Sequence, residues 1–372
     1  MKVLLTATVQ SHICQFHKPL VEILHNHNCE VHIAARDNLA EKNGLKLDFA
    51  DKVFDVPFSR SPKSLDNIKA YKQISKIIKE NQYDVIHCNT PMGGIITRLA
   101  ANKYRKTGTK VYYTAHGFHF YNGSSKLSWL VFYPIEKFFA KYTDKLITIN
   151  EEDYMCAKEK FKSDIYHIHG VGVDKSRYFP VDEEEKNQLR QIHGFQDDEK
   201  IILCIGELLP NKDQQTAIRM MKELIIDSPK SKLLLAGNGP EKDNLFSLIK
   251  QNKLENNVVM LGYCTNLETY QKMSDLVISC SQREGLGLNL IEAMLSGNPI
   301  VATTNRGHRE LIEDNKNGFL IPLHDDAQLK EKIVELFANK ELYDKFSVYG
   351  IEKGNLYSSD SVKKELEIIY FT

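Results

Sequence analysis

The residues best suited to chemistry lie in a stretch where two glutamates flank a glycine-containing turn. Residues 283–294 read REGLGLNLIEAM, with Glu284 on the turn and Glu292 within a helical pattern. Gly285 and Gly287 allow a tight turn, and the amides that open a helix attract anions because they lack intrahelical partners and lie at the positive end of the helix dipole. Carboxylates accept hydrogen bonds from hydroxyl groups. The pattern therefore predicts a diphosphate site with sugar or ribose hydroxyls on either side, although either glutamate alone would be an ordinary surface residue.

Three further predicted strand ends carry polar groups. Gly206 ends one strand and Lys212 follows six residues later, in GELLPNK. A lysine there can bring a point charge to a phosphate, but a lysine before a helix is commonly only solvated. Asn238 lies between two glycines in AGNGP, which allow either a close ligand or a tight connection with positive φ. Tyr263 and Cys264 end the next strand and are placed to offer backbone groups to a nucleobase.

The candidate site residues lie at the ends of predicted strands, so parallel sheets would position them. Short apolar runs alternate with stretches of helical period along the chain, a pattern typical of parallel sheets covered by helices. The predicted strands are 3–9, 30–35, 84–89, 110–115, 145–150, 165–169, 200–206, 232–236, 258–262, 276–279 and 299–303. The predicted helices include 214–226, 241–251, 265–272, 288–295 and 64–80, the last with Leu65, Ile68, Ile74, Ile77 and Ile78 on one apolar stripe.

A segment with two glycines and a proline interrupts the alternation. Residues 170–180 read GVGVDKSRYFP and predict an interdomain linker. We therefore expect an α/β protein with two doubly wound, Rossmann-like domains facing each other across a cleft. The expected division is 1–170, a linker at 171–180, a second domain at 181–355 and a final helical segment at 356–372. The length of 372 residues suits two domains, and open sheets bind ligands at the carboxyl ends of their strands.

Charge is divided unevenly between the two halves. The chain has 49 basic and 49 acidic residues, but residues 1–178 have 26 basic and 18 acidic ones, and the remainder has 23 and 31. A basic half suits a phosphorylated substrate or an anionic membrane surface, or is simply a solvated face. It contains no zinc-finger, helix-turn-helix or RNP motif, so we expect no nucleic-acid partner. Seven scattered cysteines without a CxxC pair indicate reduced thiols and a cytoplasmic protein.

One aromatic stretch in the basic half has two interpretations. Residues 127–142 read LSWLVFYPIEKFFAKY and are interleaved with lysines at 126, 137, 141 and 145. This pattern fits an interfacial helix on anionic lipid. For most of these aromatic residues, a core-packed helix whose lysines extend along its surface fits somewhat better. The basic half favours peripheral attachment to the inner face of the cell membrane.

Together the motifs resemble glycosyltransferase family 4, which comprises retaining, nucleotide-sugar-dependent enzymes with the GT-B fold. The resemblance covers essentially the whole chain and is carried by EGLGLNLIEAMLSGNPIVAT, GELLPNK, AGNGP, the linker, and the later RGHRELI and NGFL. In the first half, TAHGFHF and the following YPIEK resemble the branch that builds bacterial capsules and exopolysaccharides.

The resemblance implies a role for each matched residue of the second half. Glu284 would hold hydroxyls of the transferred sugar, Glu292 would bind the ribose, and Lys212 would contact the diphosphate. The backbone at 263–264 would face the uracil. The full set of implied donor contacts is Gly206, Lys212, Asn238, Tyr263, Cys264, Gly285, Leu286, Gly287, Leu288 and Glu292, beside the catalytic Glu284.

In the first half, the resemblance implies that His116 lies near the anomeric carbon of the donor sugar. There it would hydrogen-bond the sugar and shield charge in the transition state. Without the resemblance, His116 is equally well a packed core histidine, and His119 is its less favoured substitute. Ser11 and His12 follow the first strand, where family members often have two glycines, and are candidates for approaching the acceptor or a phosphate.

One position departs from the family pattern. Family members commonly have an arginine directly after the strand glycine, and this chain has Glu207. A carboxylate near a diphosphate would repel it. We therefore expect Glu207 to point away or to pair with Lys212, with Arg283 as a candidate for supplying positive charge.

The implied activity is transfer of a hexose or N-acetylhexosamine from a UDP-sugar, the co-substrate, to a saccharide acceptor linked to polyprenyl diphosphate. The expected product belongs to capsule, exopolysaccharide or other cell-surface glycan synthesis. No cofactor is expected, and the chain has no Asp-x-Asp triplet for a metal. Two alternatives stay open: a UDP-sugar epimerase, and a non-catalytic partner subunit on the same scaffold, which Glu207 weakly favours. A dinucleotide oxidoreductase is disfavoured because no GxGxxG follows a strand.

Overall fold

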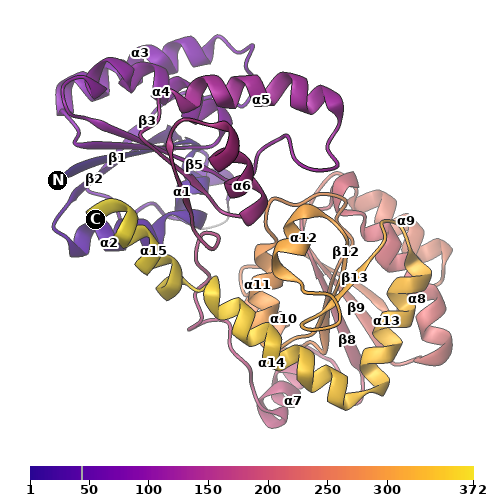
Figure 1. The fold of residues 1–372 in the computed structure, drawn as a ribbon. Helices are drawn as coiled ribbons and strands as arrows, with labels where there is room; N and C mark the ends of the chain where they lie inside the picture. The colour runs from indigo at the N-terminus through magenta and orange to yellow at the C-terminus, as the bar shows by residue number, and fades with distance from the viewer. Residues whose placement is uncertain (43–44) are drawn as a thin grey trace. The chain divides into compact units, whose positions relative to one another are not determined.

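The protein is described by a computed structural model that covers residues 1–42 and 45–372. The chain forms two compact units, one made of residues 1–172 and 359–372 and the other of residues 173–358. Each unit is a parallel sheet with helices packed on it (Figure 1). The expected α/β class with two Rossmann-like domains is confirmed.

The first unit contains a seven-stranded parallel sheet in the order β3-β2-β1-β4-β5-β6-β7. Its strands are β1 (Lys2–Val9), β2 (Glu30–Arg36), β3 (Lys52–Asp55), β4 (Val85–Asn89), β5 (Lys110–Ala115), β6 (Lys145–Thr148) and β7 (Asp164–His167). Its helices are α1 (Gln10–Phe16), α2 (Lys18–Asn26), α3 (Asp66–Asn81), α4 (Pro91–Arg105), α5 (Lys126–Ala140), α6 (Glu151–Lys160) and α15 (Ser359–Phe371), with a 3₁₀ turn at Leu39–Glu41. The strand order reverses beside β1, which makes a topological switch point.

The second unit contains a six-stranded parallel sheet in the order β10-β9-β8-β11-β12-β13. Its strands are β8 (Lys200–Ile205), β9 (Ser231–Ala236), β10 (Val258–Gly262), β11 (Leu276–Ser279), β12 (Ile300–Thr303) and β13 (Phe319–Ile321). Its helices are α7 (Glu183–Ile192), α8 (Gln214–Asp227), α9 (Lys242–Gln251), α10 (Leu267–Met273), α11 (Leu288–Leu295), α12 (Arg306–Leu311), α13 (Asp326–Ala338) and α14 (Lys340–Leu356), with a 3₁₀ turn at Pro210–Lys212. Here the order reverses beside β8.

The central strands form because their apolar runs are buried on both faces. In β1 all residues from Val3 to Val9 are buried, including two threonines. Thr6 shares a hydrogen bond of 2.9 Å with Thr97, and Thr8 shares one of 2.7 Å with Thr90. These partners satisfy hydroxyl groups that would otherwise be costly to bury.

Several predicted boundaries differ from the structure for identifiable reasons. The predicted strand 145–150 ends at Thr148, because Asn150 caps α6 by accepting a hydrogen bond from the Asp153 amide at 2.9 Å. Two short outer strands, β3 and β13, were not predicted. In α3 the predicted stripe is wrong at its start, since Leu65 and Ile68 are 74% and 55% exposed.

The C-terminal helix α15 completes the first unit. The chain leaves that unit at Gly172 and returns at Ser359. Within the unit α15 packs on α2, where Lys363 pairs with Glu22 at 2.6 Å. On the sheet side, the Tyr370 hydroxyl lies 2.6 Å from His87 Nδ1. Four of its side chains are buried there: Val362, Leu366, Ile369 and Tyr370.

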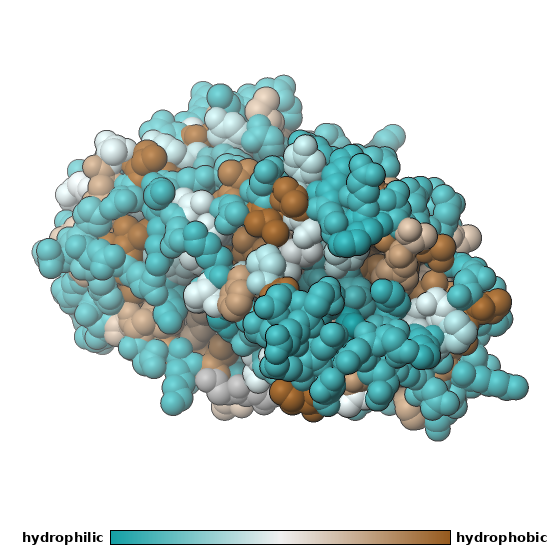
Figure 2. Space-filling view, turned by 90° about the horizontal axis from the view of Figure 1, so that it is seen from below, coloured by the Kyte–Doolittle hydropathy of each residue, from teal (hydrophilic) through white to brown (hydrophobic). Residues whose placement is uncertain are grey.

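The molecular surface is largely hydrophilic on the face drawn in Figure 2, with smaller hydrophobic groups between the polar ones. Among the described residues, no helix is both long enough and apolar enough to cross a membrane.

Candidate functional site

Lys212 and Glu284 meet at the carboxyl edge of the second sheet. Lys212 ends the 3₁₀ turn that follows β8, and Glu284 lies on the turn between β11 and α11. Because β8 and β11 are neighbours, the two turns lie side by side, and the Lys212 ammonium donates a hydrogen bond to the Glu284 carboxylate. Their side chains are 23% and 15% exposed. The structure thus joins the two residues predicted to contact the diphosphate and the sugar.

Helix α11 begins beside this pair without a side-chain cap. Its N-cap is Gly287, which has no side chain to offer the amides of the first turn. Backbone amides at an uncapped helix start are available to an anion, and the helix dipole favours negative charge there. Lys212 and the start of α11 therefore supply positive charge to the same sheet edge.

The glycines of AGNGP serve the packing of two turns against each other. A Cβ at Gly237, which has a φ of 152°, would lie 1.9 Å from the Gly206 carbonyl oxygen. One at Gly239 would lie 2.3 Å from the Leu208 carbonyl oxygen. Of the two interpretations, a tight connection accounts for these glycines without a ligand. The Asn238 backbone carbonyl accepts a hydrogen bond from the Leu208 amide at 2.9 Å.

Glu292 lies half-buried on α11, and the loss of water around its carboxyl raises the pKa of that group to about 7. The hydrogen bond from Tyr178 lowers that pKa, and so does the positive charge of nearby Arg177, but desolvation outweighs both. Arg177 in turn pairs with Glu268 at 2.7 Å. Sequence reasoning placed Tyr178 and Arg177 only in the linker, and nothing in their spacing indicated that they would surround Glu292.

Four further residues singled out in the sequence of this unit are at least partly exposed. Tyr263 is exposed and Cys264 is half-buried. Arg283 is exposed, and its carbonyl accepts a hydrogen bond from the Asn211 side chain at 3.1 Å. Glu207 is exposed too. The expected alternative in which Glu207 pairs with Lys212 is wrong, because the Lys212 ammonium is held by Glu284.

In the first unit, His116 follows β5 and lies among polar groups at the edge of the sheet. Its Nε2 is 3.2 Å from His12 Nε2 and 3.3 Å from Asn89 Oδ1. Burial lowers the pKa of His116 to about 4, so its ring is neutral at pH 7. His119, by contrast, is exposed and stacks on Phe132 with ring centroids 4.7 Å apart.

The polar groups of Ser11 are already hydrogen-bonded within the unit, whereas the ring of His12 faces another histidine. Ser11 is buried, and both its amide and its hydroxyl are engaged by the Asn38 side chain at 3.1 and 2.9 Å. His12 is turned toward His116 instead. Burial and the neighbouring His116 lower the pKa of His12.

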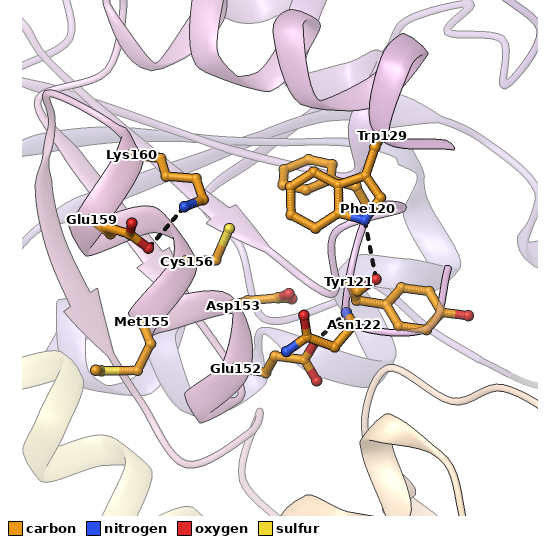
Figure 3. A pocket seen from close by; sticks show the side chains of 10 residues that line it. All are labelled: Phe120, Tyr121, Asn122, Trp129, Glu152, Asp153, Met155, Cys156, Glu159 and Lys160. Carbon is orange, nitrogen blue, oxygen red and sulfur yellow. Dashed lines mark hydrogen bonds and ion pairs between the residues drawn. The ribbon is translucent and has the colours of Figure 1, made fainter. Parts of the chain in front are cut away.

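A pocket of about 640 Å³ lies in the first unit between the segment after β5 and helices α5 and α6 (Figure 3). Its walls combine aromatic and acidic side chains. Trp129 lies beside Phe120, with ring centroids 5.1 Å apart, and its indole N–H donates to the Tyr121 carbonyl at 3.2 Å. On the other side, Glu152 accepts a hydrogen bond from the Asn122 amide at 2.6 Å. No sequence pattern indicated this pocket, because its walls come from separate segments of the chain.

Helix α5 has two apolar faces with different surroundings. Trp129 and Tyr133 pack against the core around Phe120 and Phe161. Phe139 is buried as well, whereas six other large apolar side chains of the helix are at least 37% exposed: Leu127, Leu130, Val131, Phe132, Ile135 and Phe138. The core-packed interpretation thus holds for one face of the helix, and the other face is uncovered within the described unit, where attachment to a membrane stays a prediction.

Known families match both units. The group described as glycosyl transferases group 1 matches residues 185–353, and the glycosyl transferase 4-like group matches residues 2–150. The inferred glycosyltransferase EpsD of Bacillus subtilis is 38% identical over 371 residues, which cover 99% of this chain and 96% of EpsD.

Two further comparisons concern activity and fold. The Escherichia coli UDP-Gal:alpha-D-GlcNAc-diphosphoundecaprenol alpha-1,3-galactosyltransferase is 26% identical, with 86% of this chain and 83% of that protein covered. The crystal structure of Anabaena HepE in complex with UDP and glucose superposes with a TM-score of 0.80 over 99% of both chains, at 19% identity. This last likeness concerns the fold.

Proposed function

This chain belongs to glycosyltransferase family 4 and has the GT-B fold, and from that premise we propose that it is a retaining enzyme that uses a UDP-sugar. The transferred group is a hexose or N-acetylhexosamine, and the acceptor is a saccharide linked to polyprenyl diphosphate in exopolysaccharide or capsule synthesis. The observation that carries the proposal is the Lys212–Glu284 pair beside the uncapped start of α11.

The pair suggests how the donor binds. The Lys212 ammonium binds the diphosphate, and the Glu284 carboxylate accepts hydrogen bonds from hydroxyls of the sugar. Each member of the ion pair thereby gains a new partner. When the bond to the sugar breaks, negative charge grows on the departing diphosphate. The ammonium and the α11 amides are already in place to stabilise it, which is the largest contribution that a protein makes to such reactions.

Glu292 is proposed to bind the ribose. Its carboxylate has Tyr178 as a hydrogen-bond donor and Arg177 nearby, which leaves acceptor positions for two hydroxyls. A ribose diol donates two hydrogen bonds. Glu292 is well placed for this role, because Glu284 and Glu292 flank the start of α11.

His116 is proposed to contact the donor sugar during transfer. A neutral imidazole both donates and accepts a hydrogen bond, and the low pKa of His116 keeps it neutral at physiological pH. Its neighbour His119 is exposed and stacks on Phe132.

The acceptor is proposed to bind the first unit. The pocket beside Trp129 offers aromatic rings for the apolar faces of a sugar and carboxylates for its hydroxyls. The uncovered face of α5, with lysines at 126, 137 and 141 around it, is suited to an anionic membrane surface. A lipid-linked acceptor is named for the E. coli relative, and a membrane-bound enzyme on the cytoplasmic side would meet such a substrate in place.

The test is a transfer assay with the full chain and a panel of UDP-, GDP- and ADP-sugars. The acceptors are saccharides on undecaprenyl diphosphate, and NMR reads the anomeric configuration of the product. We expect saturable transfer from a UDP-sugar with retained configuration. Interconversion of UDP-GlcNAc without any acceptor would indicate an epimerase instead, and an inverted product would contradict the retaining mechanism.

A further inference from the structure

Three histidines of the first unit direct ring nitrogens at one another. His12 lies on α1, His17 separates α1 from α2, and His116 follows β5. One nitrogen from each lies within 4.8 Å of the other two. The ring centroids are 4.5, 5.3 and 5.4 Å apart in the three pairs. The fold creates this cluster, because β1 and β5 end at the same edge of the sheet.

His17 has an unexplained buried nitrogen. Its side chain is 5% exposed, and Nε2 finds no hydrogen-bond partner among the residues that the structure describes. The neighbouring His87 shows what a structural histidine looks like in this unit, since the Tyr370 hydroxyl lies 2.6 Å from one nitrogen and the Thr114 hydroxyl 2.7 Å from the other. Burying a polar atom without a hydrogen-bond partner costs free energy of folding, so we infer that the Nε2 of His17 binds a ligand.

The spacing of the other two rings suits a metal ion. Zinc lies 2.0–2.1 Å from an imidazole nitrogen, which in a tetrahedral site separates two such nitrogens by about 3.3 Å. His12 Nε2 and His116 Nε2 are 3.2 Å apart. A hydrogen bond between the two rings would explain this distance as well, but it would leave His17 unexplained. For His17 to bind the same ion, its ring would have to turn, because nitrogens that share a zinc ion lie about 3.3 Å apart, closer than the 4.8 Å within which the three nitrogens lie.

The charge state of the cluster favours the same ligand. Burial lowers the pKa of all three rings, and the histidines lower the pKa of His12 and His17 further by repelling each other's positive charge. Neutral imidazoles have the lone pairs that metals require. Arg60 is a further positive group acting on His12, and Asn89 Oδ1 lies 3.3 Å from His116 Nε2.

We propose that His12, His17 and His116 form a binding site for a transition-metal ion of the zinc class, with a fourth coordination position open to water or an anion. A consequence rests on the proposed function: the metal occupies the His116 nitrogen that the donor sugar would otherwise contact. Zinc therefore inhibits transfer reversibly, and a chelator restores it.

The test titrates ZnCl₂ into the chelator-treated full chain by calorimetry, with cobalt as a spectroscopic probe. We expect one ion at this site and the strong visible absorption of tetrahedral cobalt. His17→Gln should weaken zinc binding at least tenfold, remove the cobalt band and retain transfer without metal. The matched control is His25→Gln, a histidine outside the cluster paired with Asp51, which should leave both readouts unchanged.

Absence of metal binding by the wild-type chain overturns the inference, as does equal zinc affinity in His17→Gln. If His17→Gln lowers the melting temperature, the wild-type chain provides the test instead: zinc should protect His12, His17 and His116 together from carbethoxylation, read by mass spectrometry. Protection elsewhere alone overturns the site. Zinc binding without any transfer would contradict the proposed function, and transfer without zinc binding would contradict the metal site.

Discussion

The Lys212 ammonium and the Glu284 carboxylate form an ion pair between the ends of neighbouring strands β8 and β11. Each group neutralises the other in the absence of substrate. In the proposed function, a bound nucleotide sugar would replace this internal pair with a phosphate–ammonium contact and a hydroxyl–carboxylate contact. The pair therefore holds both side chains in position before the donor arrives, which lowers the cost of organising the site.

Removing either member should abolish most of the activity. In Lys212→Ala and Glu284→Ala we expect kcat for sugar transfer to fall about 10²- to 10³-fold, the typical effect of losing one group that stabilises the transition state. Lys222→Ala, an exposed lysine on α8, is the matched control. Normal transfer rates in both site variants, with unchanged melting temperatures, would refute the assignment.

Glu292 should make stability depend on pH. Its folded-state pKa of about 7 lies above its ordinary value of 4.5, so the folded protein binds the proton more tightly than the unfolded chain. Its contribution is fully present below pH 4.5 and is lost as the pH rises through 7. Urea unfolding of wild type and Glu292→Gln from pH 5 to 8 measures this. As the pH rises, the wild type should lose unfolding free energy relative to Glu292→Gln. If the unfolding free energies of the two proteins change in parallel with pH, the raised pKa of Glu292 is contradicted.

Helix α15 should be needed for the stability of the first unit. Deleting residues 359–372 uncovers the sheet face under Val362 and Leu366 and removes the Tyr370 partner of His87. We expect a clear drop in melting temperature by calorimetry. The milder Tyr370→Phe leaves the ring in place but strips His87 Nδ1 of its partner, at a cost of about 1–3 kcal/mol. An unchanged melting temperature after the deletion would argue against this packing.

The exposed face of α5 should bind anionic membranes. Leu127 and Leu130 are 67% and 74% exposed, so Leu127→Ser and Leu130→Ser should leave folding intact. Each should weaken binding to phosphatidylglycerol vesicles about tenfold, because burying a leucine contributes about 1.5–3 kcal/mol. Ile192→Ser on α7, with 76% exposure, is the matched control. Equal sedimentation of all variants with the vesicles would exclude this face as the docking surface.

Local patterns in the sequence predicted most of the elements. Long apolar runs such as β1 and β8 were identified because a strand buried on both faces needs them. The turn before α11 was identified because its glycines and helix pattern are contiguous. The short outer strands β3 and β13 were missed, since four and three residues carry too little periodicity and gain their pairing from a neighbouring strand.

The sequence by itself determined the fold class, the family and which two glutamates are proposed for the site, because each rests on contiguous residues. The tertiary structure decided which distant groups meet. Lys212 pairs with Glu284 rather than Glu207, Tyr178 reaches Glu292, and His12, His17 and His116 converge. These contacts depend on strand order in the sheets, and no spacing along the chain encodes that order directly.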